Sequence, residues 1–208
     1  GLIARHPAPE ALARVVLLLP TRRAIRTLTE AFVRQSEGQA LLLPRMVPAG
    51  DLDPEEMEGW EGGPLLAGLD GPAEALAPIA PDARRVALAK LLAARQPAPE
   101  ALALAGQLAA VLDTLEIEGV RAADIADAVP AGDLQAHWAA NAQVLRTVAE
   151  LWPALLAERG LLDASRHRNL QLDALAARWA AQPPPFPVIL AGFASAPPAV
   201  ARLARTIA

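Results

Sequence analysis

Cations are concentrated at the start of the first helix that the sequence predicts. The branched apolar run at residues 15–19 is typical of a buried strand, and apolar residues at helical spacing follow it. The helix begins at Thr21, and three arginines fall in its first two turns: Arg22, Arg23 and Arg26. Free N–H groups, a hydroxyl and guanidinium groups together suit a phosphate. These four residues are therefore candidate contacts to phosphate groups, among which those of a DNA backbone are one possibility.

The same cations allow a plainer interpretation. The positive end of a helix dipole disfavours an exposed cation by about 0.3–1 kcal/mol, so three of them there need a reason. A solvated basic face is the alternative to a phosphate site. In that case Glu30, one turn after Arg26, partly neutralises the face.

A second basic cluster lies near the start of a later predicted helix and consists of Arg159, Arg166, His167 and Arg168. It is a candidate contact to DNA backbone or to a partner subunit, and a solvated face is the alternative. None of the three histidines has a second histidine four residues away, and the chain has no Cys. No metal site is therefore expected.

The motifs of nucleotide hydrolysis are missing. A P-loop requires Gly-x-x-x-x-Gly-Lys-Ser/Thr, but the single lysine, Lys90, lies between Ala89 and Leu91 in a predicted helix. A nucleotide site also needs a metal-holding acid at a strand end. Ala191 stands at the end of the strand expected at 188–191 and so occupies a degenerate Walker B position. The sequence predicts no catalytic residue here.

Composition limits the class of partner. The chain has 208 residues, a net charge of −4 and a pI near 5.4, which is the wrong sign for a protein coated in nucleic acid. Any contact to DNA must be local or shared with a larger assembly. No apolar run is long enough for a membrane span and no signal peptide is recognisable, so we expect a cytoplasmic protein with no membrane partner.

Strand–helix units at opposite ends of the chain are expected to share one parallel sheet. The fold class is α/β, a sheet of P-loop/helicase type with a large inserted all-helical subdomain, mostly helical by residue count. A second short strand is expected at 41–43. The expected divisions are the first part of the α/β core (1–46), a Gly/Pro-rich flexible insert (47–81), a helical subdomain (82–182) and the return to the core (183–208).

Short motifs spread along nearly the whole chain carry a family resemblance through their order and spacing. They are Leu17-Leu18-Leu19-Pro20-Thr21-Arg22-Arg23-Ala24, Leu41-Leu42-Leu43-Pro44-Arg45, Gly50-Asp51-Leu52-Asp53, Trp152-Pro153, Glu158-Arg159-Gly160-Leu161, Arg168-Asn169 and Val188-Ile189-Leu190-Ala191-Gly192-Phe193. Residues 18–28 resemble a conserved strand–helix of UvrD/RecB-like superfamily 1 helicases, in which a Thr and basic residues open a helix that contacts single-stranded DNA. The set as a whole resembles the N-terminal region of AddB, the second subunit of AddAB helicase-nucleases, in its alphaproteobacterial form.

The resemblance implies a helicase-like region with an inactive motor, in a subunit that takes part in recombination and DNA double-strand-break repair. The motor subunit AddA would supply translocation, and the parent complex would be an ATP-dependent helicase and exonuclease. An iron–sulfur cluster is implied only for a C-terminal nuclease domain, so no cofactor is expected in these residues. The expected function is to bind or scan DNA and to dock AddA. The alternative is a protein–protein docking module with no direct DNA contact.

Overall fold

The computed structural model describes residues 10–49, 76–93, 97–121, 124–125 and 135–208. The chain divides into two compact units, one of residues 1–71 and 172–208 and the other of residues 72–171. We name them the sheet unit and the helical unit. The sheet unit contains η1 (Leu12–Arg14), β1 (Val16–Leu19), α2 (Arg22–Gln35), β2 (Arg45–Pro48), the second half of α8 (Ala164–Ala181), β5 (Val188–Leu190) and α9 (Pro198–Ile207).

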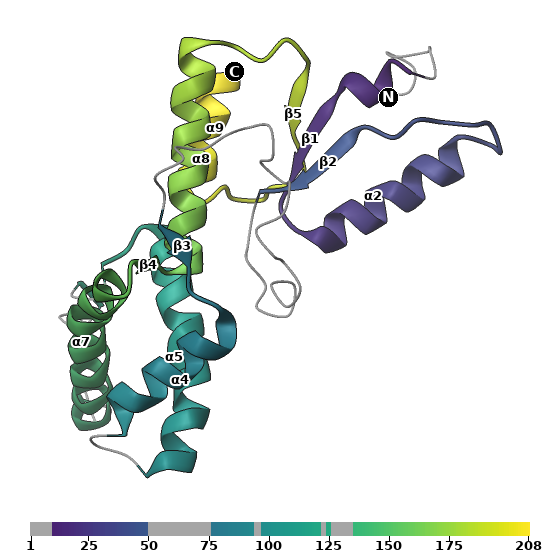
Figure 1. Cartoon of the computed structure of the whole chain (residues 1–208). Helices are drawn as coiled ribbons and strands as arrows, with labels where there is room; N and C mark the ends of the chain where they lie inside the picture. Colours follow the sequence, from purple (N-terminus) through teal and green to yellow (C-terminus); the bar gives the residue numbers. More distant parts are fainter. Residues whose placement is uncertain (1–9, 50–75, 94–96, 122–123, 126–134) are drawn as a thin grey trace. The chain divides into compact units, whose positions relative to one another are not determined.

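The sheet unit is built on three parallel strands in the order β2-β1-β5 (Figure 1). Val16 pairs with Arg45 on one side and with Val188 on the other. The two strand–helix segments from opposite ends of the chain therefore lie side by side, which confirms that prediction. The fold is a mostly helical α/β arrangement with a small parallel sheet.

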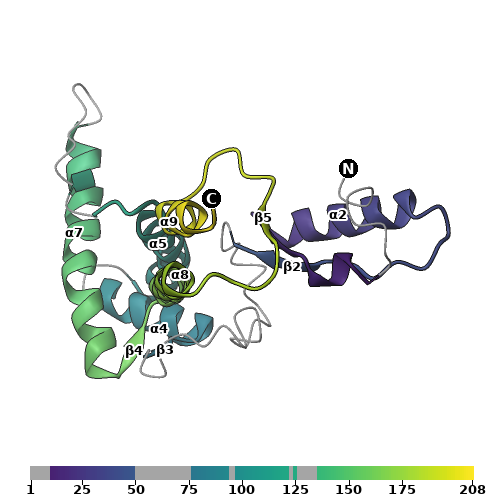
Figure 2. The same cartoon turned by 90° about the horizontal axis from the view of Figure 1, so that it is seen from above.

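Alternate residues of β1 face two separate hydrophobic clusters, because side chains alternate across a strand. Val16 and Leu18 pack with residues of α8 and α9, which lie side by side in both views (Figures 1 and 2). Leu17 and Leu19 pack with η1 and with the apolar face of α2, including Phe32. The sheet thus has helices on both faces, which explains why all four residues of β1 are buried.

The second strand does not lie where it was expected. Residues 41–43 form no strand, and Leu42 and Leu43 are exposed, whereas β2 begins at Arg45 and buries Val47. The reason is the parallel pairing, because β2 has to start beside Val16, at the far end of the sheet from the start of α2. The leucines lie in the connection that brings the chain back from the end of α2.

The segment expected as a flexible insert, 47–81, carries regular structure at both ends. Its first two residues belong to β2, and Ala77–Pro78 form β3, which pairs in parallel with β4 (Leu161–Leu162). Pro81 begins the next helix. Residues 50–75, which make up most of this prediction, lie outside the described residues.

The helical unit contains α4 (Pro81–Leu92), α5 (Ala98–Glu118), α7 (Gln135–Glu158) and the first half of α8, together with β3 and β4. Leu88, Ala105 and Trp152 are among the buried residues of its core. Small Ala side chains on α5 allow the close approach of α4 and α5. Among the described helices, none has both the length and the apolarity to cross a bilayer.

Candidate functional site

The candidate site lies at the carboxyl edge of the three-stranded sheet. β1 leads into α2 on one face of the sheet, and the neighbouring β5 leads into α9 on the opposite face. Ligands of open α/β sheets bind at this kind of position, where the connections after adjacent strands diverge. The structure therefore brings the start of α2 and the end of β5 to one edge.

Thr21, expected as the first residue of the helix, is instead its N-cap. Thr21 is in an extended conformation, and its hydroxyl oxygen accepts a hydrogen bond from the Ala24 N–H at 3.1 Å. The cap takes up the Ala24 N–H, whereas the Arg23 N–H has no acceptor within the helix, because the first turn of a helix lacks internal acceptors. Its first turn contains no acidic residue.

The three arginines of this helix differ in their surroundings. Arg22 is half-buried and takes part in an interaction within the chain. Arg23 and Arg26 are exposed, and neither has a hydrogen-bond or ion-pair partner within the part of the chain that the structure describes. Glu30 was expected to neutralise Arg26. Its described ion pair is instead with Arg34, one turn later in the helix, where Glu30 Oε2 lies 3.8 Å from Arg34 Nη1.

Ala191 follows the last residue of β5, and its N–H donates to the Leu18 carbonyl at 3.0 Å. Its side chain packs in the cluster on the α2 side of the sheet, with Ala24 and Ile25. The methyl group at this position therefore fills apolar space between the strand and the helix. An acidic side chain here would be a carboxylate partly withdrawn from water, which is unfavourable without a counter-ion.

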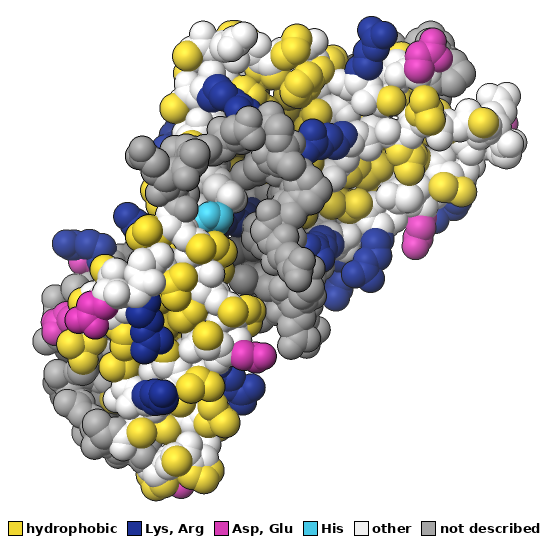
Figure 3. All heavy atoms as spheres, in the orientation of Figure 1, with side chains coloured by type: hydrophobic (Ala, Val, Ile, Leu, Met, Phe, Trp, Pro, Cys, Tyr) yellow, Lys and Arg dark blue, Asp and Glu magenta, His cyan; other side chains and the backbone are white. Residues whose placement is uncertain are grey.

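Charge is distributed unevenly between parts of the chain. The described residues of the sheet unit include nine arginines and four carboxylates, whereas residues 50–75 contain eight carboxylates and neither Arg nor Lys. Among the described residues of the sheet unit, cations therefore outnumber carboxylates although the whole chain has a net charge of −4. On the face seen in Figure 3, the Lys and Arg side chains are spread over several places and do not form one large basic patch.

The second predicted basic cluster belongs to the helical unit, and the structure does not bring its members onto one exposed face. Arg159 and Arg166 are exposed, and Arg166 forms an ion pair with Glu116 of α5 at 3.3 Å. Arg168 is buried. His167 is half-buried, and desolvation lowers its pKa below the ordinary value. Three consecutive residues point in different directions around a helix, which explains this separation.

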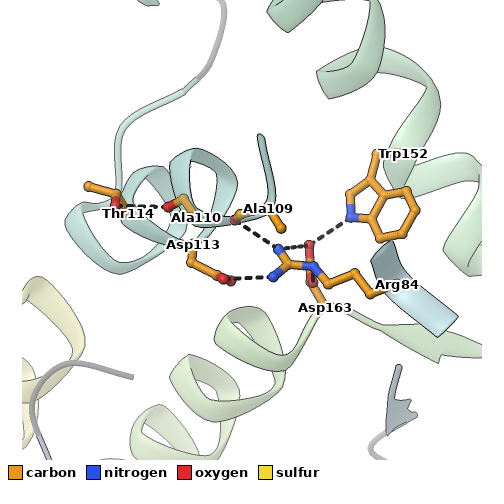
Figure 4. A network of polar contacts seen from close by, with 7 residues as sticks. All are labelled: Arg84, Ala109, Ala110, Asp113, Thr114, Trp152 and Asp163. Carbon is orange, nitrogen blue, oxygen red and sulfur yellow. Dashed lines mark hydrogen bonds and ion pairs between the residues drawn. The ribbon is translucent and has the colours of Figure 1, made fainter. Parts of the chain in front are cut away.

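A buried polar network in the helical unit was not predicted from the sequence (Figure 4). Arg84 of α4 donates from Nη1 to Asp113 Oδ2 of α5 at 2.6 Å. Its Nη2 donates to Asp163 Oδ2 at 3.1 Å and to the Ala109 carbonyl at 3.3 Å, and its Nε lies 2.7 Å from Asp163 Oδ1. Trp152 of α7 donates its indole N–H to Asp163 Oδ2 at 2.7 Å.

Burial and charge act in opposition within this network. Burial lowers the pKa of Arg84, but the hydrogen bonds and charges of Asp113 and Asp163 outweigh it, so the pKa of Arg84 is raised. Burial raises the pKa of Asp163, and the nearby Arg84 and Trp152 only partly offset it. The arrangement joins α4, α5, α7 and the residue before α8, and it satisfies a buried cation with two carboxylates.

One sequence signal could have found Arg84. It lies four residues before Leu88 and eight before Leu92, which places a cation on the buried face of α4. Arginine is rarely buried without a partner, so this spacing predicts an acidic partner elsewhere. The partners themselves lie 29 and 79 residues away, beyond any local pattern.

Within the described ranges, no group of three His, Cys, Asp or Glu residues is arranged to hold a metal ion. No family model, curated protein or solved structure matches this chain.

Proposed function

We propose that this chain is a non-catalytic, helicase-like region that binds or scans DNA through the start of α2 and docks a motor subunit. The parent protein would be the AddB-type subunit of a helicase-nuclease that acts in the repair of DNA double-strand breaks, with AddA as the motor. The carrying observation is a pair of exposed arginines, Arg23 and Arg26, that have no partner among the described residues. They follow a Thr-capped helix start at the carboxyl edge of a parallel sheet.

The geometry suits a phosphodiester backbone better than a particular base sequence. Guanidinium groups and backbone N–H groups at a helix start bind phosphate oxygens, which fixes the position of a strand without reading its bases. Ala191, a methyl group at the end of β5, offers no metal ligand and so fits binding without hydrolysis.

The test is the affinity of the protein for fluorescently labelled oligo(dT), measured by anisotropy over a range of salt concentrations. Arg23→Ala together with Arg26→Ala should weaken binding by at least about tenfold, because each removes a charge-assisted hydrogen bond. The slope of log affinity against log salt should fall by about 0.7 for each phosphate of a single strand that the variant no longer neutralises.

Arg34→Ala is the matched control, since Arg34 is an exposed arginine in the last turn of the same helix. It should leave both the affinity and the salt slope nearly unchanged. If the double variant binds oligo(dT) as tightly as the wild type does, the start of α2 is not the DNA contact.

A protein–protein docking module is the second candidate, and the helical unit provides the observation that favours it. Large apolar side chains are exposed on α4, α5 and α7, among them Val86, Leu102 and Leu151. Exposed apolar side chains are typical of surfaces that bind other proteins when they are grouped together. Capture of purified AddA by a chain that does not bind oligo(dT) at low salt would favour this candidate over DNA binding.

A further inference from the structure

The turn that follows β5 lies directly against the turn that opens α2. Gly192 has a φ of +80°, and a Cβ built on it would lie 3.3 Å from Cδ and 3.6 Å from Cγ of Pro20. Pro20 comes immediately before Thr21, the cap of α2. The proline ring is held by its own backbone and cannot rotate away as a long flexible side chain could. The size of residue 192 therefore bears on where α2 begins.

We propose that Gly192 is a positioning residue for the start of α2. Through the start of α2 it also positions the phosphate contacts, and this role in phosphate binding rests on the proposed function. The absence of a side chain at residue 192 allows the connection between β5 and α9 to lie against Pro20. The Ala191 N–H bond to the Leu18 carbonyl holds both turns at the same edge of the sheet. A methyl group at 192 would press on Pro20, so the two turns have to move apart by a few tenths of an ångström next to the cap residue Thr21.

Gly38 provides a matched control for the backbone. Its φ is +81°, and a Cβ added there would meet no heavy atom within 4 Å. Gly38 also belongs to the sheet unit. Gly192→Ala and Gly38→Ala therefore share the unfavourable left-handed conformation of a non-glycine residue, but only Gly192→Ala adds a contact with Pro20.

The first measurement is amide hydrogen exchange at Ala24, whose N–H donates to the Thr21 hydroxyl. Gly192→Ala should speed this exchange, whereas Gly38→Ala should leave it at the wild-type rate. Adding Pro20→Ala to Gly192→Ala should restore slow exchange, because it removes the ring atoms that the new methyl group meets. This measurement requires no DNA.

The second measurement is oligo(dT) affinity as a function of salt. Gly192→Ala should weaken binding by about tenfold and lower the salt slope by about 0.7, which corresponds to one phosphate fewer in contact with the protein. A purely structural defect reduces the fraction of folded protein, which lowers the apparent affinity but does not change the slope. Gly38→Ala should change neither quantity.

The outcomes separate the two proposals. Equal exchange at Ala24 in Gly192→Ala and Gly38→Ala overturns the positioning role, whatever the protein does with DNA. Faster exchange in Gly192→Ala alone, in a protein that does not bind oligo(dT), supports the positioning role of Gly192 and overturns the proposed function.

Discussion

Replacing Arg84 with Met removes the cation that lies between the carboxylates of Asp113 and Asp163 in the core of the helical unit. The guanidinium donates to Asp113, to Asp163 and to the Ala109 carbonyl, and the side chains of the ion pairs are 8–13% exposed. Removing one partner of a buried ion pair destabilises a protein by about 3–5 kcal/mol. Because two carboxylates lose their counter-ion here, we expect a value near the upper end. That is a large part of the roughly 5–15 kcal/mol that stabilises a folded domain.

The assay is urea unfolding followed by far-UV circular dichroism, with Arg85→Met as the control. Arg85 is the next residue of α4, is exposed, and makes one long hydrogen bond from Nε to the Leu102 carbonyl at 3.5 Å. The same substitution at this site should change the free energy of unfolding by no more than about 0.5 kcal/mol. The difference between the two variants therefore reports the buried network and not helix propensity.

Two further measurements sharpen the test. Adding Asp113→Asn to Arg84→Met should recover part of the lost stability, because it removes one of the unpaired buried charges. The pKa of Asp163 is already raised by burial, and removing Arg84 raises it further, so its ionisation opposes folding above its ordinary pKa. The deficit of Arg84→Met should therefore shrink as the pH falls toward about 4. Equal stability of Arg84→Met and Arg85→Met would refute the reasoning.

Three smaller effects should be measurable in the same way. Thr21→Ala removes the acceptor of the Ala24 N–H and should lower the free energy of unfolding by about 0.5–2 kcal/mol, whereas Thr21→Ser should retain most of it. Burial lowers the pKa of His167, so the unfolded chain binds more protons than the folded one. Stability should therefore decline as the pH falls below about 6.5, and His167→Gln should reduce that decline. Arg202 pairs with Asp173 at 2.7 Å, but both side chains are well exposed. Arg202→Met should thus cost no more than about 1 kcal/mol, and less at high salt.

Local patterns predicted the parts of the sheet unit that depend on neighbouring residues. Residue spacing predicted the apolar runs that contain β1 and β5 and the helix near Thr21. The pairing of β1 with β5 followed from the rule that strand–helix units of one layer share a parallel sheet. The position of β2 could not be read in this way. Leu41, Leu42 and Leu43 are more apolar than Arg45–Pro48, but the register with β1 decides which residues pair.

The helical unit shows what local patterns leave out. Its described helices are rich in Ala and Leu, and surfaces made of such side chains can pack in several registers with similar energy. A packing that separated Arg84 from Asp113 and Asp163 would leave buried charges without partners, which is costly. We therefore expect the buried pairs to favour the observed register of α4 against α5 and against the start of α8. These ion pairs join residues that are distant in the sequence. A spacing rule within α4 can therefore indicate that Arg84 is buried, but it cannot identify Asp113 and Asp163 as its partners.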